Sequence, residues 1–540
     1  MANQTQKLPT FHQSWFKRLI GIILILGIFF RFAHLDHKVY WHDETRTSLR
    51  IAGYLVSELT EQAFDGNETS PDDLMVFQHI NPDRGVFNTL LSLGANDPKH
   101  PPLYYGLARI WAQVVGDSVA QVRSLSAVLG VVAFPCLFWL CRELFEMPQV
   151  AWVAIALFAV SPFHVLYAQE AREYSLWTTT ILFASAALLR ALRLQTKGSW
   201  VVYALAAASS IYSFTLSVLV LIAHGVYVLG VCDPDGKPIS GTWSRIVSPS
   251  MKRFLCGAIA ACVSFVPWAA LIVLRFSQLR GNTAHLVNET ESGSLVKAWI
   301  IGLSSVFIDP DPSALIALTR NISTPVAYLW QLPALLLAGY SVYFLCRKTP
   351  RHVWLLPVAL IGIQVITMMV PDLVLGIRLS LAPRYMIPLY LGVLIATAYC
   401  LTYYLTSIRR WRRTLGQGLW IAVLTGGIVS CVISFQAQVW WTKGPSFDYP
   451  PIARVINQSD RPLVIANARG INAGNVISLS YMLDADVRLL LISNTDVPPL
   501  SVDTQPVYVF SPTDTLRHKL AEQYAVQAVD ELGNLLRLTS

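Results

Sequence analysis

Long apolar runs joined by short polar links occupy most of the chain. Several runs reach the roughly 17–25 residues that a helix needs to cross a lipid bilayer. Examples are 125–141, 254–274, 326–345 and 419–435. The apolar stretch 199–231 is too long for one helix, so we expect a hairpin with its break near Ser209-Ser210 and Ser213. The pattern predicts an all-α polytopic membrane domain over residues 1–444 rather than a protein with one anchor.

The charges in the links set the expected orientation. Four short links rich in Arg and Lys belong on the cytoplasmic side by the positive-inside rule. These links are 188–197, 232–253, 346–351 and 408–413. Working between them, we predict about eleven spans. They lie near residues 18–34, 124–141, 149–163, 174–189, 199–213, 214–231, 253–275, 325–346, 352–370, 384–406 and 416–436. The N-terminus is then cytoplasmic, and residues 35–99, 276–324 and 445–540 are extracytoplasmic.

Three stretches outside the predicted spans carry their own patterns. Apolar residues recur at helical spacing over Thr47–Ala63, which indicates a helix lying in the membrane interface. The apolar helix expected over Pro101–Val115 is short and carries Arg109 near its middle, so we assign it as interfacial or partly inserted. Residues 445–540 predict a small soluble α/β domain. Its expected elements are strands at 463–466, 487–492, 507–510 and 535–538 and helices at 474–483 and 515–524.

Composition agrees with a membrane protein and argues against nucleic acid as a partner. The chain is 54% hydrophobic and only 14% charged, whereas soluble proteins carry roughly 25% charged residues. Its net charge is +8, and many of the basic residues cluster in the short links between apolar runs. The eight cysteines avoid the predicted outside loops and show no metal-ligand spacing.

Ionisable residues near span ends are the candidates for chemistry, because charges at membrane depth are costly and usually functional. The first group is Trp41-His42-Asp43-Glu44, just beyond the first predicted span. Its carboxylates could supply a general base, or bind a divalent cation together with His42. Alternatively, Asp43 or Glu44 caps a helix that begins near Thr45.

The second group, Asp97–Tyr105, lies where two prolines open a helix. Lys99 and His100 stand at the start of that helix, where a cation and free backbone N–H groups suit a phosphate. The alternative is a loop-to-helix turn with solvated charges.

Two later groups combine arginine with tyrosine. Arg172 and Glu170 belong to the segment Tyr167–Tyr174 and lie on different faces of any helix there. Arg384 precedes Tyr385 in the outside link that leads into the tenth predicted span. A guanidinium at membrane level can bind a phosphate through two hydrogen bonds. Both groups could instead be interfacial anchors.

Taken in order, these groups resemble the GT-C superfamily of polyprenyl-phosphate-sugar-dependent membrane glycosyltransferases. The resemblance rests on the acidic pair, His100-Pro101-Pro102, the Arg-x-Tyr segment preceded by Ser161-Pro162, and Arg384-Tyr385. It covers residues 15 to about 440. The most similar branch is the dolichyl-phosphate-mannose protein mannosyltransferase-like one, family 39, which is related to the aminoarabinose lipid A transferases. Those transferases have Lys-Pro where this chain has His100-Pro101, which weakens the case for a lipid A-like acceptor.

The resemblance implies a role for each matching residue. Asp43 matches the acidic position that activates or orients the acceptor, and Glu44 is its neighbour in the pair. Lys99 or His100 matches a position near the donor phosphate, and two arginines match basic positions facing the same cavity, Arg172 and Arg384. The other residues expected in the substrate cavity are His42, Tyr104, Tyr167, Glu170, Tyr174 and Tyr385.

We therefore expect an enzyme that transfers a sugar from a polyprenyl-monophosphate donor to a hydroxyl of a lipid, glycan or protein. The reaction is expected to invert the anomeric centre on the extracytoplasmic face of a bacterial plasma (inner) membrane. No cofactor is indicated beyond a divalent cation near Asp43. Two alternatives stay open: a transporter or flippase of a lipid-linked or anionic substrate, and a polysaccharide polymerase or ligase with a diphosphate-linked donor. Charges gathered at one membrane face, without a repeated half, favour the enzyme over the transporter.

Overall fold

The computed structural model describes residues 13–231, 248–275, 292–311, 313, 331–493, 497, 500, 505–530 and 533–539. Within these ranges it is mostly helical. Six of the described helices are long and apolar enough to cross a membrane, or seven if a bent pair counts as one span. By length and composition the chain is therefore an integral membrane protein, and the span count from the sequence stays a prediction. The chain divides into two compact units.

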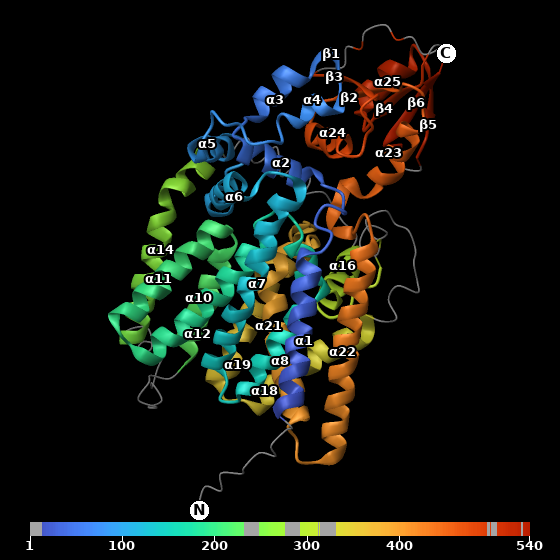
Figure 1. Cartoon of the computed structure of the whole chain (residues 1–540). Coiled ribbons are helices and arrows are strands. Elements are labelled where there is room, and N and C mark those ends of the chain that lie inside the picture. The colour runs from blue at the N-terminus through green and yellow to red at the C-terminus, as the bar shows by residue number, and fades with distance from the viewer. Residues whose placement is uncertain are drawn as a thin grey trace, which may run out of the picture. The chain divides into compact units, whose positions relative to one another are not determined.

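The first unit, called the helical unit, comprises Met1–Ala33, Lys99–Leu103 and Ser126–Gln436. Figure 1 shows its helices lying largely side by side. They are α1 (Gln13–Phe32), α8 (Pro148–Ala159), α9 (Pro162–Ala168), α10 (Tyr174–Leu194), α11 (Lys197–Ser213), α12 (Ser217–Gly230), α14 (Pro249–Leu274), α16 (Ser292–Ser304), α18 (Gln331–Lys348), α19 (Arg351–Gln364), η3 (Val365–Met369), α20 (Val370–Leu375), η4 (Leu379–Leu381), η5 (Pro383–Met386), α21 (Ile387–Leu405) and α22 (Arg410–Gln436). Almost every residue of α21 is buried, because α8, α18, α19 and α22 pack around it.

Proline and serine positions explain two breaks among these helices. α8 ends at Ala159 and α9 starts at Pro162 with a bend of 60°. Pro162 has no N–H to continue the helix and disfavours helical geometry at the residue before it. The predicted span 149–163 therefore corresponds to α8 and the start of α9, with this bend near its end. The hairpin break predicted near Ser213 is confirmed, since α11 ends there and α12 begins at Ser217. Most of the predicted outside loop 276–324 lies outside the described residues.

The second unit, called the mixed unit, comprises His34–Pro98, Tyr104–Leu125 and Ala437–Ser540. Two helices continue from one unit into the other along the chain, α6 (Pro102–Val115) and α7 (Val119–Leu144). The remaining elements are α2 (His42–Ala52), α3 (Val56–Ala63), β1 (Asp65–Thr69), α4 (Pro71–Met75), α5 (Val86–Asn96), η6 (Trp441–Asp448), α23 (Tyr449–Asn457), β2 (Leu463–Asn467), α24 (Asn472–Ser480), β3 (Arg488–Ile492), β4 (Val507–Phe510), α25 (Asp514–Ala521), β5 (Ala525–Ala528) and β6 (Leu535–Thr539).

A mixed sheet in the order β1-β3-β2-β4-β6-β5 forms the core of this unit. β2 runs parallel to β3 and β4, and the other neighbours pair antiparallel. The parallel strands β2 and β4, and β3 apart from Arg488, are buried and mostly apolar, as strands covered on both faces usually are. All the elements predicted for residues 445–540 are present, β4 with the predicted ends and the others with ends shifted by one to three residues. The sequence pattern missed two strands without apolar alternation, β5 and the Asp-Gly-Asn-Glu-Thr strand β1. Because β1 comes from the 35–99 region, the sheet is not built from residues 445–540 alone.

The helix predicted over Thr47–Ala63 is wrong, because the structure has two helices there. α2 ends at Gly53, whose φ of 93° is a left-handed conformation that glycine adopts without steric cost. Arg84 donates a hydrogen bond to the Gly53 carbonyl over 2.7 Å, so the turn is held from a distant loop. α3 then starts at Val56 in a new direction.

Candidate active site

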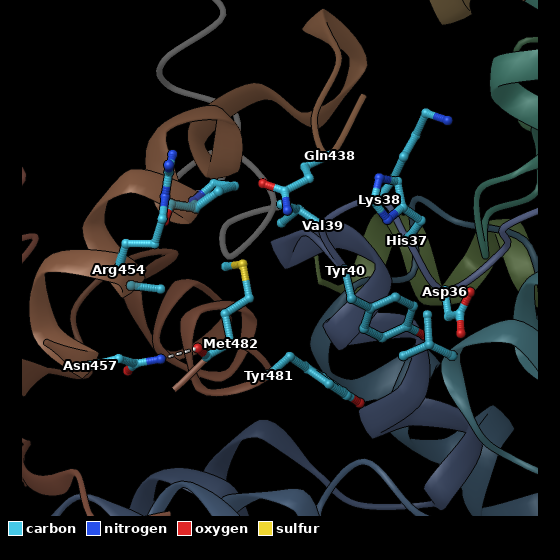
Figure 2. Close-up of a pocket in the computed structure, with 13 residues that line it drawn as sticks. Asp36, His37, Lys38, Val39, Tyr40, Gln438, Arg454, Asn457, Tyr481 and Met482 are labelled. Carbon is cyan, nitrogen blue, oxygen red and sulfur yellow. Dashed lines mark hydrogen bonds between the residues drawn. The ribbon is translucent and has the colours of Figure 1, made fainter. Parts of the chain in front are cut away.

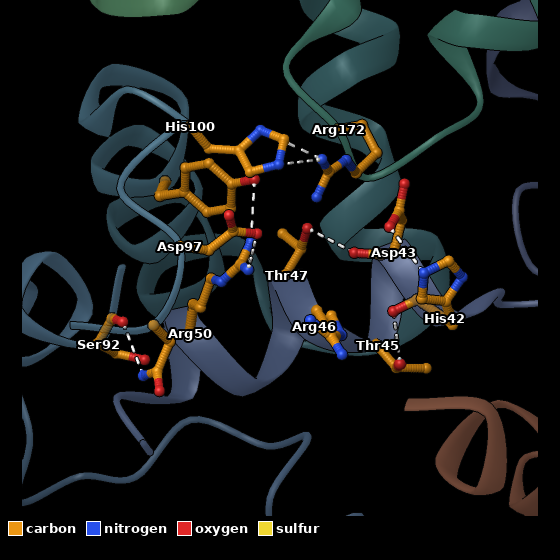
Figure 3. Close-up of polar contacts among 12 residues, drawn as sticks. His42, Asp43, Thr45, Arg46, Thr47, Arg50, Ser92, Asp97, His100 and Arg172 are labelled. Carbon is orange, nitrogen blue, oxygen red and sulfur yellow. Dashed lines mark hydrogen bonds and ion pairs between the residues drawn. The ribbon is translucent and has the colours of Figure 1, made fainter. Parts of the chain in front are cut away.

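A buried cluster of His100, Arg172 and Glu173, called the His100 cluster, lies in the helical unit. Nη2 of Arg172 is 3.3 Å from Nε2 of His100 (Figure 3). Oε1 of Glu173 lies 2.6 Å from Nδ1 of His100 and 3.4 Å from Nη2 of Arg172. Glu173 is 0% exposed and Arg172 2%. A buried carboxylate therefore holds together two side chains that would otherwise repel each other when charged.

Contacts with α1 and α7 position the loop that carries Arg172. Nε2 of Gln169 donates to the carbonyls of Phe30 and Ala33 over 2.7 and 3.0 Å. Oγ of Ser126 donates to the Arg172 carbonyl over 3.2 Å. This burial is inconsistent with an interfacial anchor, whose guanidinium would reach into water. The loop is therefore built to present Arg172 inside the unit.

Arg384 joins this site through aromatic rings. Its guanidinium lies 5.7 Å from the ring centre of Tyr174 and 5.4 Å from that of Tyr385, and Arg172 lies 5.8 Å from Tyr174. These are cation–π distances. The Tyr167 ring packs edge-on against Tyr174 at 5.2 Å. Five predicted site residues from two distant segments thus come together around the Tyr174 ring.

Three other predicted residues occupy different surroundings. Lys99 is half-buried beside His100 in the chain. Glu170 is fully buried, and its carbonyl accepts the Arg172 backbone N–H over 2.7 Å. Tyr104 belongs to the mixed unit, where it is fully buried and packs edge-on against Tyr105 at 5.6 Å.

Sequence reasoning missed Glu173, although it adjoins Arg172. Burial by itself raises the pKa of Glu173, but the charges of Arg172 and His100 outweigh burial, and the pKa falls to about 2 from its usual 4.5. The signal available in the sequence was an acidic residue directly beside the proposed phosphate-binding arginine.

The low pKa of Glu173 predicts a pH-dependent stability. A carboxylate with a depressed pKa stabilises the folded state above its unfolded pKa, and the gain is lost as pH falls toward the folded pKa. As the pH is lowered from 4.5 to about 2, we expect the thermal unfolding temperature of the wild type to decrease. The decrease should be smaller in Glu173→Gln. Thermal scans in detergent at stepped pH measure this, with the exposed Glu146→Gln as the matched control. Parallel pH curves for wild type and Glu173→Gln would contradict the prediction.

The acidic pair lies at the start of α2 in the mixed unit. Nε2 of His42 is 3.1 Å from Oδ1 of Asp43, and the two side chains are 13% and 18% exposed (Figure 3). The residue that precedes the helix is Trp41, which makes no side-chain cap, so neither acid plays the capping role considered above. Asp43 sits in the first helical turn, where the helix dipole favours a negative charge. It is a partly accessible carboxylate with a histidine partner.

Glu44 is placed quite differently from Asp43. Its carboxylate is fully buried and takes two hydrogen bonds of 2.7 Å from Arg123 and one of 3.0 Å from Lys443. Arg123 and Lys443 were not predicted, because they lie 79 and 399 positions away along the chain. A carboxylate held by two cations is unsuited to accept a proton, so the geometry favours a structural role for Glu44 beside Asp43.

A second buried ion pair anchors the far end of α2. Nη2 of Arg50 contacts Oδ2 of Asp97 at 2.8 Å, and Nη1 donates to the Tyr105 hydroxyl over 3.3 Å (Figure 3). Arg50 is 2% exposed. With Glu44 at one end and Arg50 at the other, α2 is fixed at both ends, which holds Asp43 in place.

The predicted cation near Asp43 has no obvious ligand set within the described ranges. No group of three or more His, Cys, Asp or Glu side chains there is arranged to hold a metal ion. The cation therefore stays a prediction.

Residues 99–269 match the family model of the dolichyl-phosphate-mannose-protein mannosyltransferases. The match covers roughly a third of the chain and contains the whole His100 cluster. For this segment it confirms the family resemblance found in the motifs. Asp43 and Arg384 lie outside the matched residues. No curated protein sequence matches the chain.

The chain is also similar to solved membrane transferases at low identity. It is 14% identical to ArnT from Cupriavidus metallidurans bound to undecaprenyl phosphate, with a TM-score of 0.49, covering 97% of this chain and 98% of that one. It is 11% identical to the archaeal oligosaccharyltransferase AglB from Archaeoglobus fulgidus in complex with an inhibitory peptide and a dolichol-phosphate. That TM-score is 0.48, with 98% of this chain and 75% of that one covered.

Proposed function

We propose that the chain is a GT-C-type glycosyltransferase that uses a polyprenyl-monophosphate-linked sugar as donor. One observation carries the proposal. The family match over 99–269 contains His100 and Arg172, and these two side chains lie 3.3 Å apart inside the helical unit. A paired imidazole and guanidinium, with a second guanidinium sharing an aromatic wall, suit a phosphate group.

In the proposed reaction the acceptor hydroxyl oxygen attacks the anomeric carbon as the bond from that carbon to the phosphate oxygen breaks. Arg172, His100 and Arg384 stabilise the negative charge that grows on the leaving polyprenyl phosphate. Asp43 takes the hydroxyl proton, with His42 orienting its carboxylate. A single displacement of this kind inverts the anomeric centre. We place the reaction on the extracytoplasmic side of a bacterial plasma membrane.

The test uses the purified full chain with native lipid and a panel of polyprenyl-monophosphate sugars. Release of free polyprenyl phosphate from one donor, with membrane extract supplying acceptors, is the expected result. Arg172→Gln should need a donor concentration roughly tenfold higher, because a charge-assisted hydrogen bond to phosphate is lost. The control is Arg193→Gln, an exposed arginine at the other end of α10.

Three results would speak against the proposal. If no donor were consumed, the chain would not have the proposed enzymatic function. Movement of the intact lipid-linked sugar across vesicles would favour a transporter, and use of a diphosphate-linked donor alone would favour a polymerase or ligase.

A further inference from the structure

A cavity of about 300 Å³ opens in the mixed unit, apart from every residue discussed above as catalytic. Figure 2 shows Arg454, Asn457 and Met482 toward one side and Tyr40 toward the other, with Gln438 and Tyr481 between them. This volume is near the lower end of the roughly 300–1,000 Å³ of small-molecule sites, and it exceeds what a lone phosphate fills.

The charged groups around the cavity are mainly positive. Lys38 and Arg454 both line it; Arg454 is exposed, whereas Lys38 is buried at 4% exposure and its side chain points away from the other lining residues (Figure 2). Nε of Arg454 donates a hydrogen bond to the Pro450 carbonyl over 3.3 Å. Both Nη groups can therefore bind a ligand. The one acidic lining residue is Asp36. A ligand with one negative group therefore suits the balance of charge.

Two tyrosine rings form part of the remaining wall, and both are already fixed. Tyr40 and Tyr481 pack edge to face at 5.2 Å. Each hydroxyl is held elsewhere, that of Tyr40 by Ser48 at 2.6 Å and that of Tyr481 by Gln78 at 3.5 Å. Rigid tyrosine rings beside a side-chain amide, Gln438, offer both an apolar face and hydrogen bonds, as a sugar ring requires.

The wall of the cavity is continuous with the segment that carries Asp43. The Val39 N–H donates to the Gln438 carbonyl over 2.9 Å. Arg123 donates to the carbonyls of Lys38 and Val39 over 2.9 and 2.8 Å, and the same guanidinium holds Glu44. A ligand in the cavity would thus contact the same hydrogen-bonded segment that carries Asp43.

We infer that this cavity binds the anionic group of a saccharide acceptor, a carboxylate or a phosphate carried on a sugar. The inference rests on the proposed function, since it supplies the acceptor side of that reaction. Arg454 pairs with the anion, the Gln438 amide hydrogen-bonds to the sugar, and the tyrosine rings contact the sugar ring.

Binding to the full-length protein in detergent tests this by saturation-transfer NMR. The probes are glucuronic acid, glucose 1-phosphate, neutral glucose and inorganic phosphate. We expect at least one anionic sugar to bind more tightly than glucose and than inorganic phosphate. Whether glucuronic acid or glucose 1-phosphate binds shows whether the cavity prefers a carboxylate or a phosphate. Arg454→Gln should weaken that binding about tenfold or more. Arg517→Gln, an exposed arginine on α25, is the control and should change nothing.

Several outcomes would overturn the inference. If glucose bound as tightly as the anionic sugars, the cavity would not require an anionic group. If inorganic phosphate bound as tightly, the cavity would not recognise the sugar. Absence of binding, or no effect of Arg454→Gln, removes the site. Because binding is read without turnover, Asp43→Asn should bind the probes like the wild type. Failure of donor turnover with intact probe binding would therefore refute the proposed function alone.

Discussion

Asp43→Asn is expected to lower donor turnover by roughly 10²–10⁴-fold while the donor still binds, because a general base typically contributes that much. Asparagine keeps the size of the side chain and can still contact Nε2 of His42, which lies 3.1 Å from the carboxylate in the wild type. It cannot accept the proton of the attacking hydroxyl. Release of polyprenyl phosphate from the active donor measures the rate, and retention of labelled donor on the purified protein measures binding.

The matched control for this variant is Asp83→Asn, an exposed aspartate of the mixed unit. It should leave both rate and donor binding unchanged. Turnover by Asp43→Asn within about threefold of the wild type would exclude a base role for Asp43, since base catalysis contributes far more. Loss of donor binding together with rate would instead assign Asp43 to the binding of the donor.

Arg123→Met is expected to destabilise the protein by about 3–5 kcal/mol, because breaking a buried pair from one side leaves a buried charge behind. Arg123 donates to both oxygens of Glu44 and to the carbonyls of Leu35, Lys38 and Val39. Without it, those acceptors lose the guanidinium, while Lys443 still contacts Glu44 at 3.0 Å. Thermal and denaturant unfolding in detergent give the change in the free energy of unfolding.

Arg488→Gln provides the comparison for a similar pair on the surface. Arg488 and Glu68 are joined at 3.0 Å, with side chains 38% and 47% exposed. Exposed pairs of this kind contribute about 0–1 kcal/mol, because solvent screens them. If Arg123→Met cost no more than Arg488→Gln, the buried network would not be what holds the segment before Asp43 in place.

The sequence identifies several residues of the candidate site but not their partners. His100, Arg172 and Arg384 were each identified from their position at a span end, where a buried charge is costly. The grouping of Arg172 and Arg384 around Tyr174 could only be expected from the family resemblance, because it joins segments far apart in the chain. Glu44 was predicted as the partner of Asp43 in catalysis, and no local pattern indicated that two distant cations occupy it.

The sequence by itself determined that long apolar helices build the helical unit, with ends a few residues away from those predicted, since an apolar run and its flanking prolines act over neighbouring residues. It also determined the buried strands of the mixed unit, whose apolar runs are local. Only the tertiary structure decided that the polar strand β1 pairs with β3, that Glu173 joins His100 to Arg172, and that Arg123 and Lys443 reach Glu44. The physical reason is that hydrophobic periodicity depends only on residues close together in the chain. The partner of a buried charge depends instead on which distant segments the packing brings within about 3 Å.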